Sequence, residues 1–161
     1  MARRRGRLAV RVKFQGLKEI SADLEKVGLT LRSPEVTAEV QRGADVMAAR
    51  VRARAPVDQG NLRRGVYTAS AQRDGFTPMT RRGRPINRGL RYPARPGQVV
   101  LVSSVFYSQF VDKGRKKSSK RGYMRARPFF RSGVNESRET AQSFILARLR
   151  KLIESKWGGK R

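Results

Sequence analysis

The apolar positions near the start of the chain follow first the periodicity of a strand and then that of a helix. Residues 8–14 alternate apolar and polar side chains from Val10 to Phe14, which is typical of a strand with one buried face. Gly16 ends this pattern. The next apolar positions recur at steps of three and four, which predicts an amphipathic helix. Its apolar stripe consists of Leu17, Ile20, Leu24, Val27 and Leu31.

A second helix is predicted from Ser33, as N-cap, through Pro34 at the first helical position to about Ala55, because Pro56 ends it. Its apolar stripe is Val36, Val40, Ala44, Met47 and Val51, and Gly43 and Ala48 permit close approach of a neighbour. Its last turns carry three cations, which we expect to complement the helix dipole and to face solvent. These are Arg50, Arg52 and Arg54.

Strands are predicted at residues 65–72 and 98–105, which are rich in β-branched and small side chains. The segment between them, 74–97, contains four Gly, four Pro and six Arg without sustained periodicity, and we interpret it as a long basic loop. Residues 106–112 fit either a continued strand or a short helix. Residues 113–131 then carry nine basic side chains and no acid.

A third, long helix is predicted from near Pro128 to about Lys156. Its stripe is Phe130, Val134, Ala141, Ile145, Leu149 and Leu152, widened by Phe144 and Ile153. The elements together predict an α+β fold, with a small antiparallel sheet packed against two or three amphipathic helices, long basic loops and a long C-terminal helix. We expect one domain over residues 8–156, between a basic arm at 1–7 and a tail at 157–161.

Positive charge dominates the composition. The chain of 161 residues has 38 Lys+Arg against 12 Asp+Glu, a formal net charge of +26, and 28 of the cations are Arg. So much charge of one sign repels itself in a compact state and favours an anionic partner, for which nucleic acid is the first candidate. Codon bias can exchange Lys for Arg, but it does not explain the excess of positive over negative charge.

Several kinds of chemistry are excluded by the residue types. The chain has no Cys and no His, which removes thiol catalysis, disulfides, Cys/His zinc sites and the usual neutral-pH general base. The acids are scattered, without a phosphate-binding loop or a second catalytic signature beside them. We therefore expect no catalytic residue, metal or cofactor. We also expect no export signal, no membrane partner, and synthesis and use in the cytoplasm or in a particle assembled there.

Known nucleic-acid-binding motifs are missing as well, so we expect sequence-independent contact with phosphates through the basic loops. The same side chains could instead contact acidic protein surfaces. The candidate contact residues are Arg81, Arg82, Arg84, Arg88, Arg91, Arg95, Arg115, Lys116, Lys117, Lys120 and Arg121.

Three stretches resemble a known protein family. The sequence Ala-Pro-Val-Asp-Gln-Gly-Asn-Leu at 55–62 is similar to the Ala-Pro-Val-Asp-x-Gly-x-Leu signature of the neck, or tail-completion, proteins of long-tailed bacteriophages, the family that includes the minor tail protein Z of phage lambda. Tyr-Ser-Gln-Phe-Val-Asp-Lys-Gly at 107–114 and Ala-Arg-Pro-Phe at 126–129 are similar to two further elements of that family, in the same order. Asp112 stands where Glu is common in the family.

The resemblance covers roughly residues 15–156. Its motif residues are Ala55, Pro56, Val57, Asp58, Gly60, Leu62, Tyr107, Phe110, Val111, Asp112, Gly114, Ala126, Arg127, Pro128 and Phe129. We expect these residues to shape the fold: Pro56 stops a helix, Asp58 and Gly60 make a turn, Leu62 re-enters the core, and Phe129 anchors the start of the last helix.

The resemblance implies a structural virion protein at the head-tail junction, made in the host cytoplasm. Such a subunit joins head and tail as a ring around the DNA channel, with sixfold stoichiometry expected from tail symmetry. Its implied partners are other copies of itself, the stopper or head-completion and portal-side proteins, the tail-terminator or tail-tube proteins, and packaged double-stranded DNA. The alternative from another class is a ribosomal or nucleoid-type nucleic-acid-binding module; a DNA-end-processing enzyme is a third and weaker reading.

Overall fold

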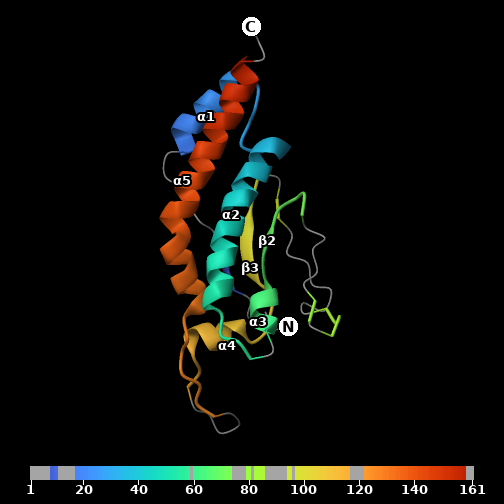
Figure 1. Ribbon diagram of the computed structural model, residues 1–161, viewed down its shortest axis with the longest axis vertical. Helices are drawn as coiled ribbons and strands as arrows, with labels where there is room; N and C mark the ends of the chain where they lie inside the picture. The colour runs from blue at the N-terminus through green and yellow to red at the C-terminus, as the bar shows by residue number, and fades with distance from the viewer. Residues whose placement is uncertain are drawn as a thin grey trace, which may run out of the picture.

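Two long helices and a small sheet form the framework of the described structure (Figure 1). The computed structural model describes residues 8–10, 17–58, 60–73, 79–80, 82–85, 94–95, 97–116 and 122–158. The elements are, in chain order, β1 (Leu8–Val10), α1 (Leu17–Lys26), α2 (Pro34–Arg54), α3 (Asn61–Arg64), β2 (Val66–Ala69), β3 (Val100–Ser103), α4 (Ser108–Lys113) and α5 (Phe129–Gly158). The predicted α+β class, with a small antiparallel sheet and a long C-terminal helix, is confirmed.

Helices α2 and α5 run antiparallel and pack closely along their length (Figure 1). Gly43 of α2 lies against Ile145 of α5, and Gly133 of α5 lies against the backbone and side chain of Val51. A side chain at either glycine would occupy space that the partner helix fills. The prediction that small residues of the second helix admit a close neighbour is therefore confirmed.

The sheet has the strand order β1-β3-β2, with both pairs antiparallel. Its face toward the helices contributes Val66 and Leu101 to the main apolar cluster, whereas Tyr67 and Val102, which are paired across the strands, belong to a cluster on the other face. The predicted strand at residues 8–14 is confirmed for Leu8–Val10, and residues 11–14 lie outside the described part.

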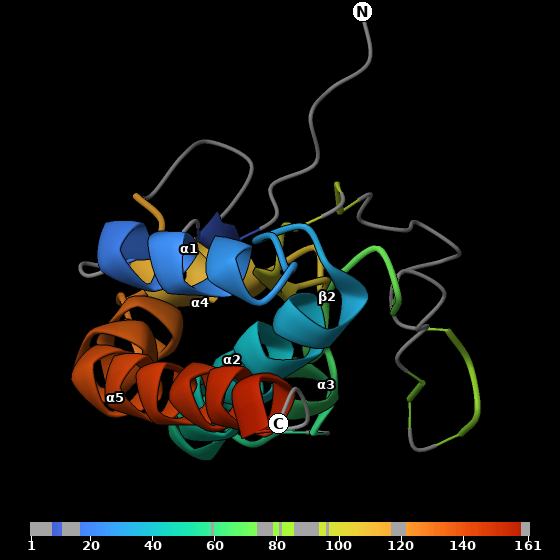
Figure 2. The same cartoon turned by 90° about the horizontal axis from the view of Figure 1, so that it is seen from above.

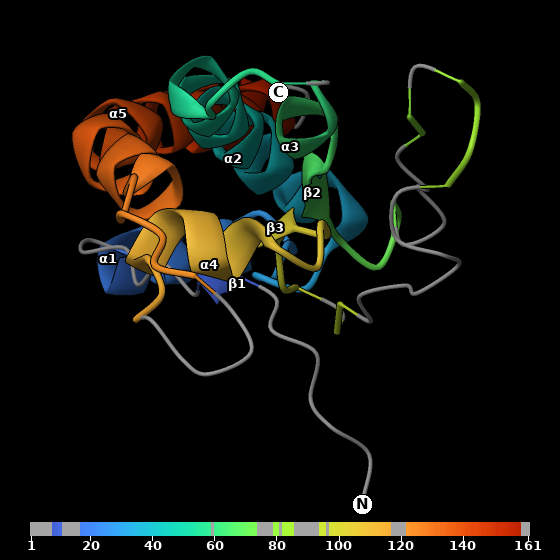
Figure 3. The ribbon, with the colours of Figure 1, turned by 90° about the horizontal axis from the view of Figure 1, so that it is seen from below.

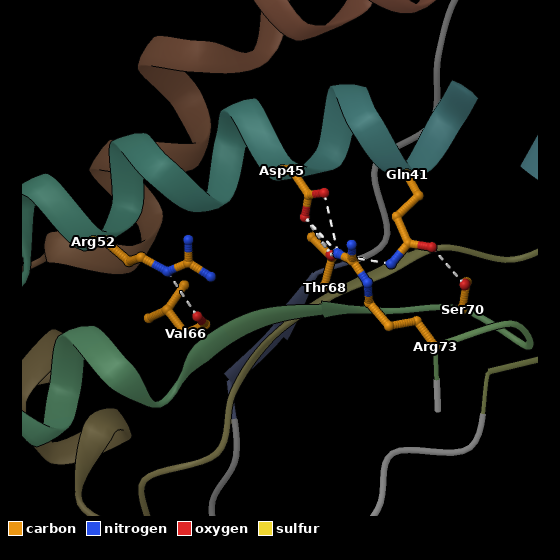
Figure 4. A network of polar contacts seen from close by, with 7 residues as sticks. All are labelled: Gln41, Asp45, Arg52, Val66, Thr68, Ser70 and Arg73. Atoms are coloured by element: carbon orange, nitrogen blue, oxygen red, sulfur yellow. Dashed lines mark hydrogen bonds and ion pairs between the residues drawn. The ribbon is translucent and has the colours of Figure 1, made fainter. Parts of the chain in front are cut away.

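Polar side chains join α2 to the edge strand β2 (Figure 4). Thr68 donates its hydroxyl to Asp45 at 2.5 Å, and the same carboxylate accepts from the guanidinium of Arg73 at 3.1 Å. Ser70 donates to the amide oxygen of Gln41 at 2.6 Å, while the amide nitrogen of Gln41 donates to Thr68 at 3.3 Å. Gln41, Thr68 and Ser70 are buried, and their hydrogen-bond partners make this burial between helix and strand tolerable.

Of the three arginines near the end of α2, Arg50 and Arg54 are exposed, as expected, but all three also make contacts that we did not predict. Arg50 and Arg54 both form ion pairs with Glu136 of α5. Arg52 donates from Nε to the backbone carbonyl oxygen of Val66 at 2.9 Å. Their guanidinium groups therefore connect α2 to its two neighbours, which sequence periodicity could not show.

The end of α1 differs from the predicted apolar stripe. Gly28 adopts φ 76°, and the amides of Gly28 and Leu29 donate to the carbonyls of Glu25 and Leu24. This pair of bonds with a left-handed glycine is a Schellman motif, which ends the helix and turns the chain. Leu29 is buried as a result and Leu31 is 38% exposed, so the assignment of Leu31 to the stripe is wrong.

Two other details also differ from prediction. Ser33 occupies the N-cap position of α2, but its hydroxyl accepts from the amide of Thr30 rather than from the first turn of the helix. Phe144 is 40% exposed and does not widen the apolar face of α5; Leu146 packs there instead. The remaining stripe is confirmed, and Ile145 and Leu149 pack with Ile20 and Leu24 of α1. Figure 2 shows α1 beside α5.

We predict that Gly133→Ala destabilises the protein although alanine favours a helix. The new Cβ would lie 2.8 Å from the Cα of Val51, so the backbones of α2 and α5 must separate. Overpacking of this kind costs about 1–3 kcal/mol, against about 1 kcal/mol gained in helix propensity. Urea unfolding should show a lower free energy of unfolding. Gly158→Ala, where a Cβ meets nothing, is the control, and equal stability of the two variants would contradict the close approach of the helices.

Candidate functional site

The three motif segments lie together at the end of the helix pair where α2 ends and α5 begins (Figure 3). The first contains residues 55–58 and 60–62, the second 107–114, and the third 126–129. Residues 106–112, for which strand and helix were both open, form mainly the short helix α4. Segments that are about 50 and 70 residues apart in the sequence thus share one surface.

In the first segment, the predicted structural roles of Pro56, Gly60 and Leu62 are confirmed. Helix α2 ends at Arg54, just before Ala55 and Pro56. Gly60 has φ 74°, in the left-handed region that glycine adopts without strain, and it opens the short helix α3. Leu62 of that helix is buried in the main apolar cluster.

A close backbone approach at Gly114 joins the second segment to the third. Gly114 has φ 76°, and a Cβ there would lie 2.8 Å from the amide nitrogen of Ala126. Beyond it, Arg115 and Met124 exchange two backbone hydrogen bonds of 2.8 and 2.9 Å. The amide of Arg127 also donates to the carbonyl of Val111 at 2.8 Å. Only glycine fits at position 114 without separating these two segments.

Asp112 caps the long C-terminal helix from a different element. Its side chain is 3% exposed, and Oδ1 accepts from the amides of Phe130 at 2.8 Å and Arg131 at 3.4 Å. These amides belong to the first turn of α5, where they have no partner within the helix. The negative charge also complements the positive end of the helix dipole. Phe129 is buried beside them, which confirms the predicted aromatic anchor.

Around these structural residues lies a cavity of about 430 Å³, which we call the motif pocket. Eight of its lining residues belong to the motifs, namely Pro56, Val57, Asp58, Gly60, Leu62, Tyr107, Val111 and Arg127. Asn61, Met124 and Arg125 complete the lining and were not singled out from the sequence. The motif residues thus shape the fold, as expected, and also surround a concave surface, which was not expected.

Tyr107 forms part of the wall of the motif pocket. Burial raises the pKa of its hydroxyl above the ordinary value, and the negative charge of Asp58 raises it further. Its ring packs edge to face with that of Phe106, with centroids 5.2 Å apart. The phenol therefore stays protonated near neutral pH and can donate a hydrogen bond at the pocket.

The predicted contact cations are only partly described. Arg82, Arg84, Arg95 and Lys116 are exposed. The guanidinium of Arg115 donates to the carbonyl of Gly122 and lies 5.9 Å from the ring centroid of Phe110, so it makes contacts within its own chain. The other candidates, Arg81, Arg88, Arg91, Lys117, Lys120 and Arg121, lie outside the described residues.

The described parts of the two basic segments lie apart. Residues 82–85 lie off to one side, level with α3 (Figure 1). Arg115 pairs with Met124 next to Gly114, at the end of the helix pair where the three motif segments meet, which we call the motif end. The structure thus gives no single cationic patch for both segments within its described ranges. The charge surplus is nevertheless large, because 12 carboxylates cannot pair one to one with 38 cations.

No protein-family model, curated protein or solved structure matches this chain. Among the described residues, no group of three or more acidic side chains is arranged to hold a metal ion. Within the same residues, none of the helices combines the length and the apolar character needed to cross a membrane.

We predict that Asp112→Ala lowers the free energy of unfolding by about 1–2 kcal/mol, the usual cost of losing a helix cap. The amides of Phe130 and Arg131 would lose their acceptor. Asp112→Asn should retain most of the stability, because an amide oxygen can accept the same bonds. Thermal unfolding of both variants checks this. If both variants lost the same free energy of unfolding, the stabilisation would come from the negative charge of Asp112 and not from its hydrogen bonds.

Proposed function

We propose that this chain is a structural protein of the phage neck, which joins head and tail as an oligomeric ring around the DNA channel. In this proposal the cationic loops contact packaged DNA or acidic surfaces of neighbouring subunits. The protein acts by binding and assembly, without a catalytic step, and occupies the virion after assembly in the host cytoplasm.

The observation that carries the proposal is the convergence of the three motif segments. Four motif residues have the structural role predicted for them: Pro56 follows the end of α2, Gly60 turns the chain, Leu62 is buried and Phe129 is the aromatic anchor. The contacts of two further motif residues explain why those residue types stand there. Asp112 supplies an acceptor to the first turn of α5, and Gly114 leaves room for the backbone of Ala126. Scattered chance matches to a family signature would not be expected to meet at one end of a fold and to complete one another's contacts.

The charge surplus supports an anionic partner. The described ion pairs involve the carboxylates of Asp23, Glu39, Asp45 and Glu136, and most described cations have no such partner. A ring of such subunits would attract the DNA backbone without reading its bases. Salt should weaken that attraction steeply.

We predict that the purified chain assembles into a closed, sixfold ring at high concentration. Identical subunits that repeat one heterologous contact form a ring when the rotation closes. Sedimentation velocity gives the mass of the assembly, and negative-stain electron microscopy shows whether it has a central opening. A stable monomer or dimer that binds free DNA tightly would instead favour the nucleic-acid-binding module.

We further predict that the exposed pair Arg82 and Arg84 contributes to DNA binding. The double variant Arg82→Gln/Arg84→Gln should reduce the slope of log K against log salt by roughly 0.9 for each phosphate that the variant no longer neutralises. Fluorescence anisotropy with a labelled duplex measures this slope. Arg150→Gln/Lys151→Gln removes the same charge from an exposed part of α5 and is the control. Equal slopes for the two variants would favour acidic protein surfaces as the partner of the loop.

A further inference from the structure

The motif pocket has the size and the lining to hold an apolar side chain. Its apolar wall comes from Pro56, Val57, Leu62, Val111 and Met124. A volume of about 430 Å³ is at the lower end of the range of ligand pockets and is sufficient for one large side chain with its flanking backbone. The backbone contacts at Gly114 and the cap at Asp112 hold the elements that form this wall.

Exposed apolar side chains gather at the same end of the molecule. The described residues include eight large apolar side chains that are exposed, and four of them are in or directly beside the lining of the motif pocket. Val57, which is 62% exposed, and Met124, which is at the edge of exposure, line the pocket. Phe106 packs against Tyr107 of the lining and is 67% exposed, and Tyr123, which precedes Met124 in the chain, is 71% exposed. Clustered exposure of this kind marks interaction sites.

The charges around the motif pocket are mainly positive. Arg125 and Arg127 line it, against the single carboxylate of Asp58. Neither guanidinium forms an ion pair among the described residues, and exposed Lys113 and Lys116 lie in the adjoining segment. Free Arg side chains beside an apolar cavity suit carboxylates that flank an inserted apolar group.

We propose that the motif pocket binds an acidic peptide segment of a partner protein, with one large apolar side chain inserted and Asp or Glu side chains against Arg125 and Arg127. The charge complementarity carries this choice of occupant. A DNA duplex offers phosphates but no protruding apolar group to fill the cavity. The chain's own basic ends, residues 1–7 and 159–161, have no acid, and a second copy would bring another surface of a +26 chain against this cationic rim.

This inference rests on the proposed function in one respect, because it takes the partner to be a neighbouring subunit of the same assembly. The proposed function allows that the chain contacts acidic surfaces of neighbouring subunits. The inference states where on the chain that contact is made and which chemistry makes it. The place is the motif pocket rather than the basic loop at 74–97.

A library of short random peptides displayed on yeast, selected against the purified full chain at raised salt, tests the proposal. The enriched peptides should contain a large apolar residue flanked by Asp or Glu. Because the net charge alone would enrich acidic peptides, the deciding measurement is the affinity of one enriched peptide for pocket variants. Val57→Ser and Arg125→Glu should each weaken it at least about tenfold.

Matched controls separate the pocket from general effects of charge and hydrophobicity. Phe144→Ser removes an exposed apolar group from α5, and Arg150→Glu reverses an exposed charge there, so both should leave the affinity unchanged. All four positions are on the surface, and circular dichroism of each variant confirms folding. The proposal would be overturned if the pocket variants and the control variants lost affinity for the peptide equally. It would also be overturned if the enriched peptides lacked an apolar residue.

Other occupants give distinct results. If a second copy fills the motif pocket, Val57→Ser abolishes self-association and no selected peptide competes. If the surface binds duplex DNA, Arg125→Glu weakens DNA binding while Val57→Ser has no effect. Either result would overturn the peptide proposal. Peptide binding is measured on the single chain, so it can succeed when no ring forms, and a ring can form when no peptide binds. The two proposals therefore fail separately.

Discussion

Helices α2 and α5 approach closely because a glycine of each faces a branched side chain of the other. Gly43 admits Ile145, and Gly133 admits Val51. The two larger apolar clusters lie along this interface. One joins α1 to the C-terminal half of α5, and the other joins the N-terminal half to α3 and the sheet. Because α2 ends and α5 begins at the motif end, two of the segments that line the motif pocket adjoin these helices directly.

The few carboxylates of the chain stabilise this arrangement against the repulsion of its cations. Glu39 of α2 pairs with Arg148 of α5 as well as with Arg42, and Glu136 of α5 pairs with Arg50 and Arg54 of α2. Hydrogen bonds from Arg148 and from Arg54, respectively, lower the pKa values of Glu39 and Glu136, outweighing the opposing effect of desolvation. Both carboxylates therefore stay charged to a lower pH than usual. Their contribution to the stability of the fold is lost only as the pH falls through the lowered pKa values.

The sequence predicts what local patterns determine and misses what depends on contacts between distant segments. Periodicity and Pro34 and Pro56 locate α2, because helix boundaries follow from local sterics and hydrogen bonding. The error at Leu31 was avoidable, since Gly28 is the usual signal for a helix end. The cap of α5 was not predictable from these rules, because its acceptor, Asp112, is 18 residues away from Phe130 and belongs to another helix.

The same reasoning explains why the motif residues could be assigned a structural role while their pocket was missed. The presence of Pro56 or Leu62 at its position can be explained from the neighbouring sequence alone. That explanation does not show which distant segments the residue will lie against in the fold. In the fold, the segments that supply the wall are held by the cap at Asp112 and by the close backbone approach at Gly114. A site held in this way loses little conformational entropy on binding, so a modest number of apolar and charged contacts suffices for affinity. The surplus of positive charge attracts any anionic surface, whereas a preformed cavity selects among them by shape. The motif end is therefore the part of this chain where specificity for one partner can reside.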